Sequence, residues 1–106
     1  MKELRLAITI SAFLVPHAAP ADQADVQRGS AFVATHCARC HATGVAGDSP
    51  SANAPPFRTL HRRYPVESLE EALGEGIRTG HRTMPEFQLD QKQIQDFIAY
   101  LRSLER

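Results

Sequence analysis

Apolar positions recur with helical spacing in three segments of the chain. The clearest segment follows Asp90 and Gln93, which form a capping-box pattern, and its apolar side chains are Ile94, Phe97, Ile98, Leu101 and Leu104. A shorter amphipathic helix is predicted over residues 24–35, and another over residues 65–73, which opens with proline and acids and is closed by glycines. No segment alternates apolar and polar residues as a strand does. The pattern predicts an all-α domain of three or more helices joined by loops.

Two loops separate these helices. Residues 43–58 are rich in Gly, Pro, Ser and Asn, and a second loop runs through residues 78–87. The predicted helices carry few large apolar side chains, and so short a chain usually needs a disulfide, a metal or a bound cofactor to be stable. We therefore expect something apolar to fill the middle of the domain.

The N-terminal residues have the layout of an export signal. A basic start is followed by the uncharged run 6–15 and by small residues, Ala19 and Ala21, at the positions that a signal peptidase reads. The run is about half the roughly 20 apolar residues that a membrane-spanning helix needs. We expect residues 1–21 to be a cleaved signal peptide and residues 22–106 to be one periplasmic domain without a membrane span. A retained N-terminal anchor is the alternative.

The charge balance gives no reason to expect a nucleic-acid partner. The 12 Lys and Arg residues equal the 12 Asp and Glu residues in number. A nucleic-acid-binding surface would call for a basic excess or a basic stripe.

The run Cys37-Ala38-Arg39-Cys40-His41 carries the clearest chemistry. Cys-x-x-Cys-His is the attachment signature for c-type haem. Two thiols at this spacing can reach the two vinyl groups of one porphyrin, and the next histidine can turn its imidazole toward the iron. The motif predicts one covalent haem c, held by two thioethers from Cys37 and Cys40, with His41 as the proximal iron ligand.

Other interpretations of the two cysteines remain open at this point. A thioredoxin-like redox pair would need a strand-then-helix context, which the pattern lacks. A structural zinc site would need four ligands, and a plain disulfide is compatible with an exported protein.

From Gly29 to Leu104 the chain resembles class I cytochrome c. Gly29 corresponds to the family's N-terminal helix glycine, and Phe97 and Tyr100 correspond to the C-terminal helix positions that cross it. Val33 departs from the family, which often has an aromatic residue there, and Phe32 lies beside it. The resemblance implies a small cytochrome c fold, with helices and loops wrapped around one covalent haem.

The resemblance also implies a sixth iron ligand and a partner for the proximal histidine. Met84, followed by Pro85, matches the family's ligand methionine, and His61 and His81 are the competing candidates. In the family, a proline carbonyl accepts a hydrogen bond from the proximal imidazole. We expect Pro56 to do this, with Pro55 as the alternative register.

With both axial positions filled, the iron would carry single electrons by outer-sphere transfer and catalyse no reaction. The expected partners are donor and acceptor redox proteins, with the chain working as a monomer or within a redox complex. The alternatives are an electron-transfer subunit of a larger periplasmic dehydrogenase or oxidase complex, and a haem enzyme or gas-binding protein with an open sixth position. A basic rim of Arg78, His81 and Arg82 is expected to steer an acidic partner toward the haem edge.

Overall fold

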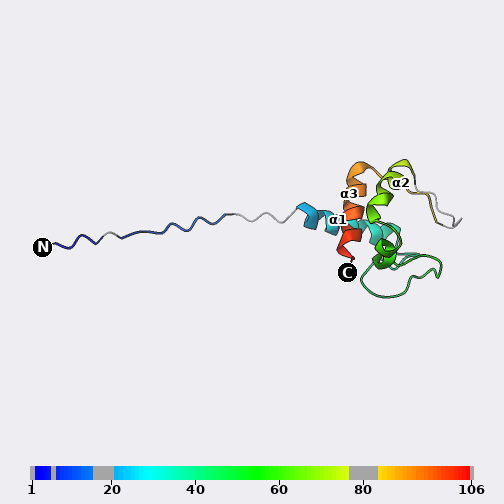
Figure 1. Ribbon diagram of the computed structural model, residues 1–106, viewed down its shortest axis with the longest axis horizontal. Coiled ribbons are helices and arrows are strands. Elements are labelled where there is room, and N and C mark those ends of the chain that lie inside the picture. The colour runs from blue at the N-terminus through cyan, green and yellow to red at the C-terminus, as the bar shows by residue number, and fades with distance from the viewer. Residues whose placement is uncertain (1, 6, 16–20, 77–83, 106) are drawn as a thin grey trace.

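The computed structural model describes residues 2–5, 7–15, 21–76 and 84–105. Its elements, in chain order, are α1 (Ala21–His36), η1 (Phe57–Arg62), η2 (Val66–Ser68), α2 (Leu69–Glu75) and α3 (Gln91–Ser103) (Figure 1). No β-strand is assigned within these described ranges. The prediction of an all-α domain is confirmed.

Three boundaries differ from the sequence prediction. The first helix begins at Ala21, three residues earlier than expected. The predicted helix over residues 65–73 is divided into the 3₁₀ turn η2 and the helix α2, which ends at Gly76, where φ is +104°. The end of the predicted loop 43–58 already belongs to the 3₁₀ helix η1.

The first and last helices cross at Gly29. A Cβ atom added to Gly29 would lie 2.7 Å from Tyr100 Cβ and still closer to the main-chain oxygen of Asp96. Only a residue without a side chain therefore allows α1 to approach α3 this closely. The Tyr100 hydroxyl extends past the crossing and donates a hydrogen bond to the Thr43 carbonyl. The crossing joins the beginning of the domain to its end.

The apolar side chains next to this crossing have separate roles. Val33 is completely buried and packs in the same cluster as Phe97 and Leu101. The Phe32 ring instead lies edge-on to the Phe97 ring, with centroids 6.5 Å apart, and lines a cavity on the other side. Phe32 therefore contacts both the core and the cavity, whereas Val33 is enclosed by the core.

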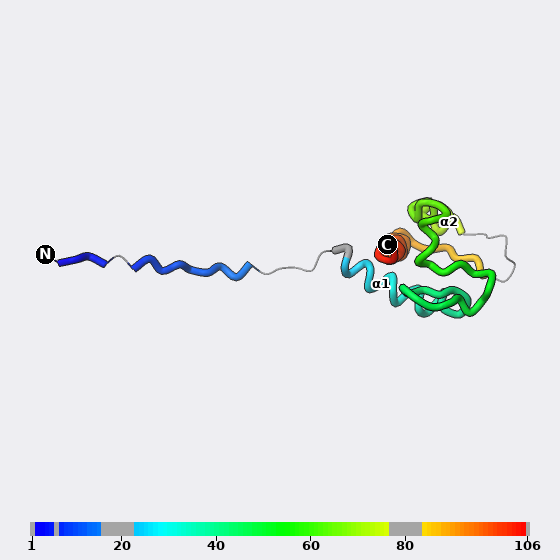
Figure 2. The backbone as a smooth tube through the Cα atoms, turned by 60° about the horizontal axis from the view of Figure 1, so that its bottom comes forward, coloured from blue at the N-terminus to red at the C-terminus, as the bar shows by residue number. Residues whose placement is uncertain are grey.

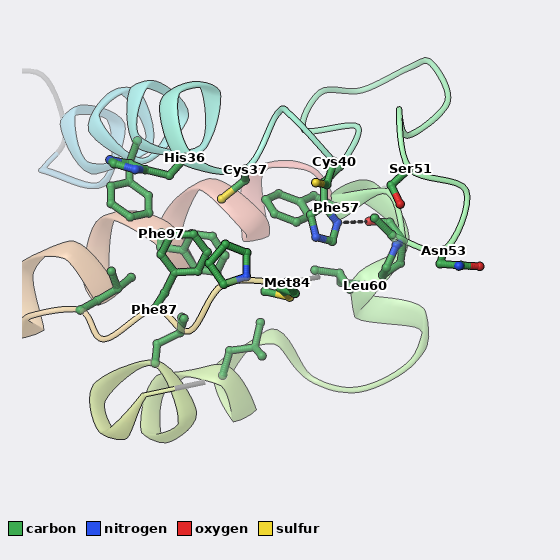
Figure 3. Close-up of a pocket in the computed structure, with 18 of the residues that line it drawn as sticks. His36, Cys37, Cys40, Ser51, Asn53, Phe57, Leu60, Met84, Phe87 and Phe97 are labelled. Carbon is green, nitrogen blue, oxygen red and sulfur yellow. Dashed lines mark hydrogen bonds between the residues drawn. The ribbon is translucent and has the colours of Figure 1, made fainter. Parts of the chain in front are cut away.

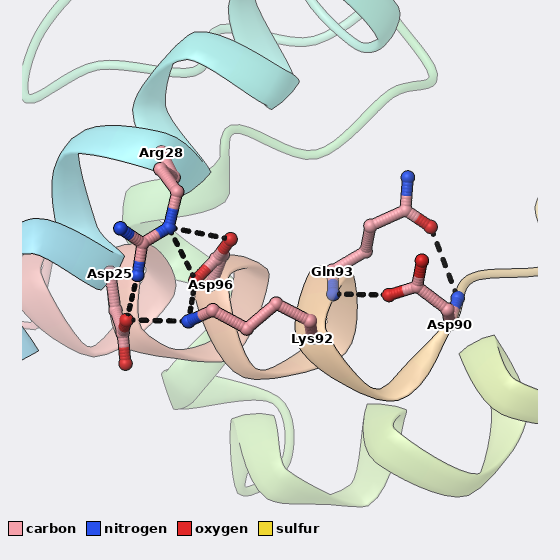
Figure 4. A network of polar contacts seen from close by, with 6 residues as sticks. All are labelled: Asp25, Arg28, Asp90, Lys92, Gln93 and Asp96. Atoms are coloured by element: carbon pink, nitrogen blue, oxygen red, sulfur yellow. Dashed lines mark hydrogen bonds and ion pairs between the residues drawn. The ribbon is translucent and has the colours of Figure 1, made fainter.

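Four charged side chains bind α1 to α3 beside Gly29 (Figure 4). Asp96 accepts hydrogen bonds from Lys92 Nζ at 2.8 Å and from Arg28 Nε at 3.2 Å. Asp25 pairs with the same two cations, at 2.7 Å from Lys92 Nζ. Both carboxylates are buried. Burial alone would raise the pKa of Asp96, but the hydrogen bonds from Lys92 and Arg28 outweigh it and hold that pKa below its usual value.

We expect Asp96→Asn to lower the free energy of unfolding by about 1–3 kcal/mol at pH 7, because hydrogen bonds to charged groups contribute on that scale. Because the pKa of Asp96 is lower in the folded chain than in the unfolded chain, its carboxylate stabilises the fold at pH values above about 3.9, the ordinary aspartate pKa. This stabilisation is lost as the pH falls through the lowered pKa of the folded chain. In denaturant titrations, the difference between wild type and variant should therefore shrink below about pH 4. Asp48→Asn, at an exposed loop position, is the matched control. A difference that stays constant to pH 2 would contradict this account.

The start of α3 has the predicted capping box. Asp90 Oδ1 accepts a hydrogen bond from the Gln93 main-chain nitrogen at 2.8 Å, and Gln93 Oε1 accepts one from the Asp90 main-chain nitrogen at 3.0 Å (Figure 4). The two bonds satisfy donors that would otherwise lack partners at the helix start. The cap fixes where α3 begins and therefore how its apolar stripe faces the core.

The N-terminal segment lies apart from the helical body (Figures 1 and 2). Its apolar side chains are exposed, Leu14 at 96% and Phe13 at 89%. None of the helices in the described residues combines the length and apolar character needed to cross a membrane. The predicted cleavage after Ala21 falls at the beginning of α1 and stays a prediction.

Candidate functional site

A cavity of about 310 Å³ lies at the centre of the helical body. Its walls come from the end of α1, from η1, from α2, from the segment before α3 and from α3 itself. The aromatic side chains among them are Phe32, Phe57, Phe87 and Phe97, together with Tyr64 (Figure 3). A cavity with apolar walls and a few converging polar groups is typical of a cofactor site.

The end of α1 positions the cysteine motif at this cavity. The main-chain nitrogen of Cys37 donates to the Val33 carbonyl at 2.9 Å, and those of Cys40 and His41 donate to the Cys37 carbonyl at 3.2 and 3.0 Å. The motif is therefore a tight turn that continues the helix. Cys37, Cys40 and His41 all line the cavity.

His41 is oriented by the loop that follows it. Its Nδ1 donates a hydrogen bond to the Pro55 carbonyl at 2.8 Å (dashed in Figure 3), and its ring lies 4.8 Å from the Phe57 ring centroid. Because a carbonyl can only accept, Nδ1 carries the proton and Nε2 has its lone pair free for a metal. This bond fixes both the tautomer and the direction of the imidazole.

The prediction that Pro56 accepts this bond is wrong, and the alternative register, Pro55, is the one found. The Pro56 carbonyl instead accepts the main-chain nitrogen of Thr59 at 3.0 Å and its hydroxyl at 2.9 Å. Pro56 precedes the first residue of η1, so its carbonyl starts that helix and points along it. Pro55 lines the cavity beside His41, and its carbonyl accepts the hydrogen bond from the His41 ring.

Of the predicted sixth ligands, Met84 lines the cavity (Figure 3). Pro85 lines it as well, so the Met84-Pro85 segment forms one part of the wall. His61 lies on η1 outside the cavity lining. His81 lies outside the described residues, as do Arg78 and Arg82 of the expected basic rim.

The other interpretations of the cysteines fit the geometry poorly. Cys37 and Cys40 are not joined in a disulfide. Burial raises the pKa of the Cys37 thiol to about 11, whereas redox-active thiols have lowered pKa values. Within the described residues, no three side chains of His, Cys, Asp or Glu come together as a zinc site would require.

The donor set fits a c-type haem. If haem is bound here, the two thiols and the imidazole on one turn would hold it, and the thioether of Met84 would be available as a further iron ligand. The aromatic side chains offer flat apolar surfaces for a porphyrin, which is itself flat and apolar.

Sequence reasoning missed four polar residues of the cavity lining, Ser51, Asn53, Arg63 and Tyr64. Burial raises the pKa of the Tyr64 hydroxyl, and the charge of Arg63 opposes that rise. The place of Arg63 in the cavity lining could have been predicted from the sequence, because Phe57, Leu60 and Arg63 follow the three-residue period of a 3₁₀ helix. Sequence reasoning also missed His36, whose ring packs 4.6 Å from Phe32 at the cavity rim.

Comparisons with known proteins agree with this site. Residues 26–105 match the cytochrome c family. The chain is 32% identical over 106 aligned residues to cytochrome c6 of Picosynechococcus sp. (strain ATCC 27264 / PCC 7002 / PR-6), with 94% of this chain and 91% of that protein covered. No solved structure matches the chain. Since the family match spans both the cysteine motif and the segment with Met84, the chain belongs to the cytochrome c family.

Proposed function

We propose that this small electron carrier works in the periplasm, on one haem c whose iron is held axially by His41 and Met84. Family membership makes the chain an electron carrier with one covalent haem c, not an enzyme. The finer proposal is supported most by one observation, that Cys37, Cys40, His41 and Met84 all line the same cavity.

The bound haem supplies an iron that gains and loses one electron. His41, oriented by the Pro55 carbonyl, presents Nε2 as a ligand of fixed direction in both oxidation states. Met84 offers a neutral sulfur, which favours the reduced iron relative to a second imidazole. With haem bound, the aromatic walls would keep water from the iron and so reduce the reorganisation that accompanies a change of charge. A site of this kind exchanges electrons without binding a substrate.

The periplasmic location is proposed from the N-terminal residues. Residues 7–15 carry no charge, and the apolar side chains among them are exposed and take no part in the core. Such a segment fits a signal peptide that is removed on export.

The native protein should have the mass of the chain from about Asp22 plus one haem, because export removes the leader and both thiols form thioethers. Intact-mass measurement on periplasmic material tests this. Extraction with acidified acetone should leave the haem on the protein, whereas release of the haem would contradict covalent attachment. In a Cys37→Ala/Cys40→Ala variant, extraction should release any haem that is bound, which makes this variant the control.

A further inference from the structure

The 3₁₀ helix η1 and the residue after it carry a cluster of positive charge. Residues 49–66 contain no acidic residue. The basic residues in this stretch, here called the η1 basic ridge, are Arg58, His61, Arg62 and Arg63. The stretch therefore carries three arginines and no acid, although acidic and basic residues balance in the chain as a whole.

These arginines differ from Arg28, Lys92 and Arg102, each of which is paired with a carboxylate. Arg28 and Lys92 pair with Asp25 and Asp96, and Arg102 pairs with Glu67 at 2.6 Å. In the part of the chain that the structure describes, Arg62 and Arg63 have no carboxylate within ion-pair distance, and Arg58 bonds only the neutral carbonyl of Gly47 at 2.7 Å. The positive charge of the ridge is therefore not neutralised within the described residues.

The ridge lies at the edge of the cavity. A 3₁₀ helix has three residues per turn, so Phe57, Leu60 and Arg63 follow one another on the same side. Phe57 and Leu60 are buried against the core, and all three residues line the cavity. Arg62 is exposed beside them, and Tyr64, which also lines the cavity, is 37% exposed. A protein bound on the ridge would therefore lie next to the cofactor.

The negative charge of this region is concentrated on the next helix. Glu70, Glu71 and Glu75 of α2 are all exposed. An acidic surface approaching the domain is attracted to the ridge and repelled by α2, so the two elements orient it.

We propose that the η1 basic ridge is the docking surface for an acidic electron-transfer partner, and that electrons pass at the Arg63–Tyr64 edge of the cavity. The proposal rests on the proposed function, because it names the partner's chemistry and the place where that partner binds. The ridge consists of other residues than the basic rim expected over residues 78–82, which lie outside the described residues.

The proposal is tested by measuring how fast charged inorganic oxidants oxidise the reduced, haem-loaded protein. Arg62→Gln removes one charge at an exposed position outside the cavity lining. Oxidation by the anion hexacyanoferrate(III) should slow by about three- to tenfold at low ionic strength, the size expected for one charge acting on a trivalent ion about 10 Å away. Oxidation by the cation tris(1,10-phenanthroline)cobalt(III) should not slow, and the effect on the anion should fade as salt is raised to about 0.5 M.

Gln91→Glu is the matched control, because it changes the net charge by the same amount in the exposed first turn of α3. An effect of Gln91→Glu equal to that of Arg62→Gln would show a response to net charge alone and overturn the proposal, as would an unchanged rate for Arg62→Gln. Failure of the unmodified protein to be oxidised by either reagent would instead contradict electron carriage itself.

A second measurement locates the surface directly. An oligoglutamate peptide, titrated into ¹⁵N-labelled reduced protein at low salt, should shift the amide signals of residues 58–64. Shifts centred on residues 78–82, or spread evenly over the domain, would overturn the assignment to the ridge.

Discussion

Replacing Met84 with alanine is expected to open the sixth position of the iron and to lower the reduction potential. The reason is that a neutral thioether stabilises the reduced iron relative to the oxidised iron. Water or a histidine in its place would stabilise the oxidised iron more than the thioether does. The measurements are a redox titration and the visible spectrum of the oxidised protein, in which the charge-transfer band from methionine sulfur should disappear. The reduced variant should also bind carbon monoxide, which the wild type should not.

His61→Gln is the control for this experiment, because His61 was a competing ligand and lies outside the cavity lining. It should leave the spectrum and the potential unchanged. Survival of the sulfur band in Met84→Ala would contradict the ligand assignment, and loss of that band in His61→Gln would do the same.

Phe97→Ala is expected to lower the free energy of unfolding by about 3–5 kcal/mol, the usual range for truncating a large buried aromatic side chain. Phe97 is 7% exposed, and its ring lies edge-on to the rings of Phe57, at 5.9 Å, and of Phe32, at 6.5 Å. The same side chain therefore supports the helix crossing and one wall of the cavity. Denaturant unfolding followed by far-ultraviolet circular dichroism measures the loss.

Tyr100→Phe is the matched comparison, since it keeps the ring at the crossing and removes only the hydroxyl that bonds the Thr43 carbonyl. We expect a loss of about 1 kcal/mol, the contribution of a single hydrogen bond. Equal losses of unfolding free energy for the two variants, or an unchanged unfolding midpoint for Phe97→Ala, would mean that the apolar face of α3 does not stabilise the core.

The parts of the fold that could be predicted are those with a strong local signal. The α3 stripe and its cap depend on residues three or four positions apart, so the pattern is visible in the sequence itself. Gly29 and Tyr100 could be paired only through the resemblance to a family, because they are distant in the chain. The helix η1 was missed since it has only two buried apolar residues, Phe57 and Leu60, and follows two prolines.

The site was predictable in its residue types and less so in its geometry. The motif at Cys37 identified the cofactor because its spacing reflects the distance between two vinyl groups. Pro55 and Pro56 carry the same sequence signal, and only the start of η1 decides which carbonyl faces His41. The ion-pair network could not be predicted either, since Arg28 and Asp96 are 68 positions apart.

The crossing at Gly29 also bears on the order in which the protein matures. Because α1 and α3 are at opposite ends of the domain, their contact closes a long stretch of chain, which costs more loop-closure entropy than a local contact does. Until it forms, Phe97 cannot complete the cavity wall or the apolar cluster against which Cys37 packs. In the folded chain the Cys37 thiol is half-buried, and burial raises its pKa to about 11, which makes it a poor nucleophile. We therefore expect the thioether bonds to form while the last helix is still undocked, so that maturation ends with α3 closing over a haem already attached.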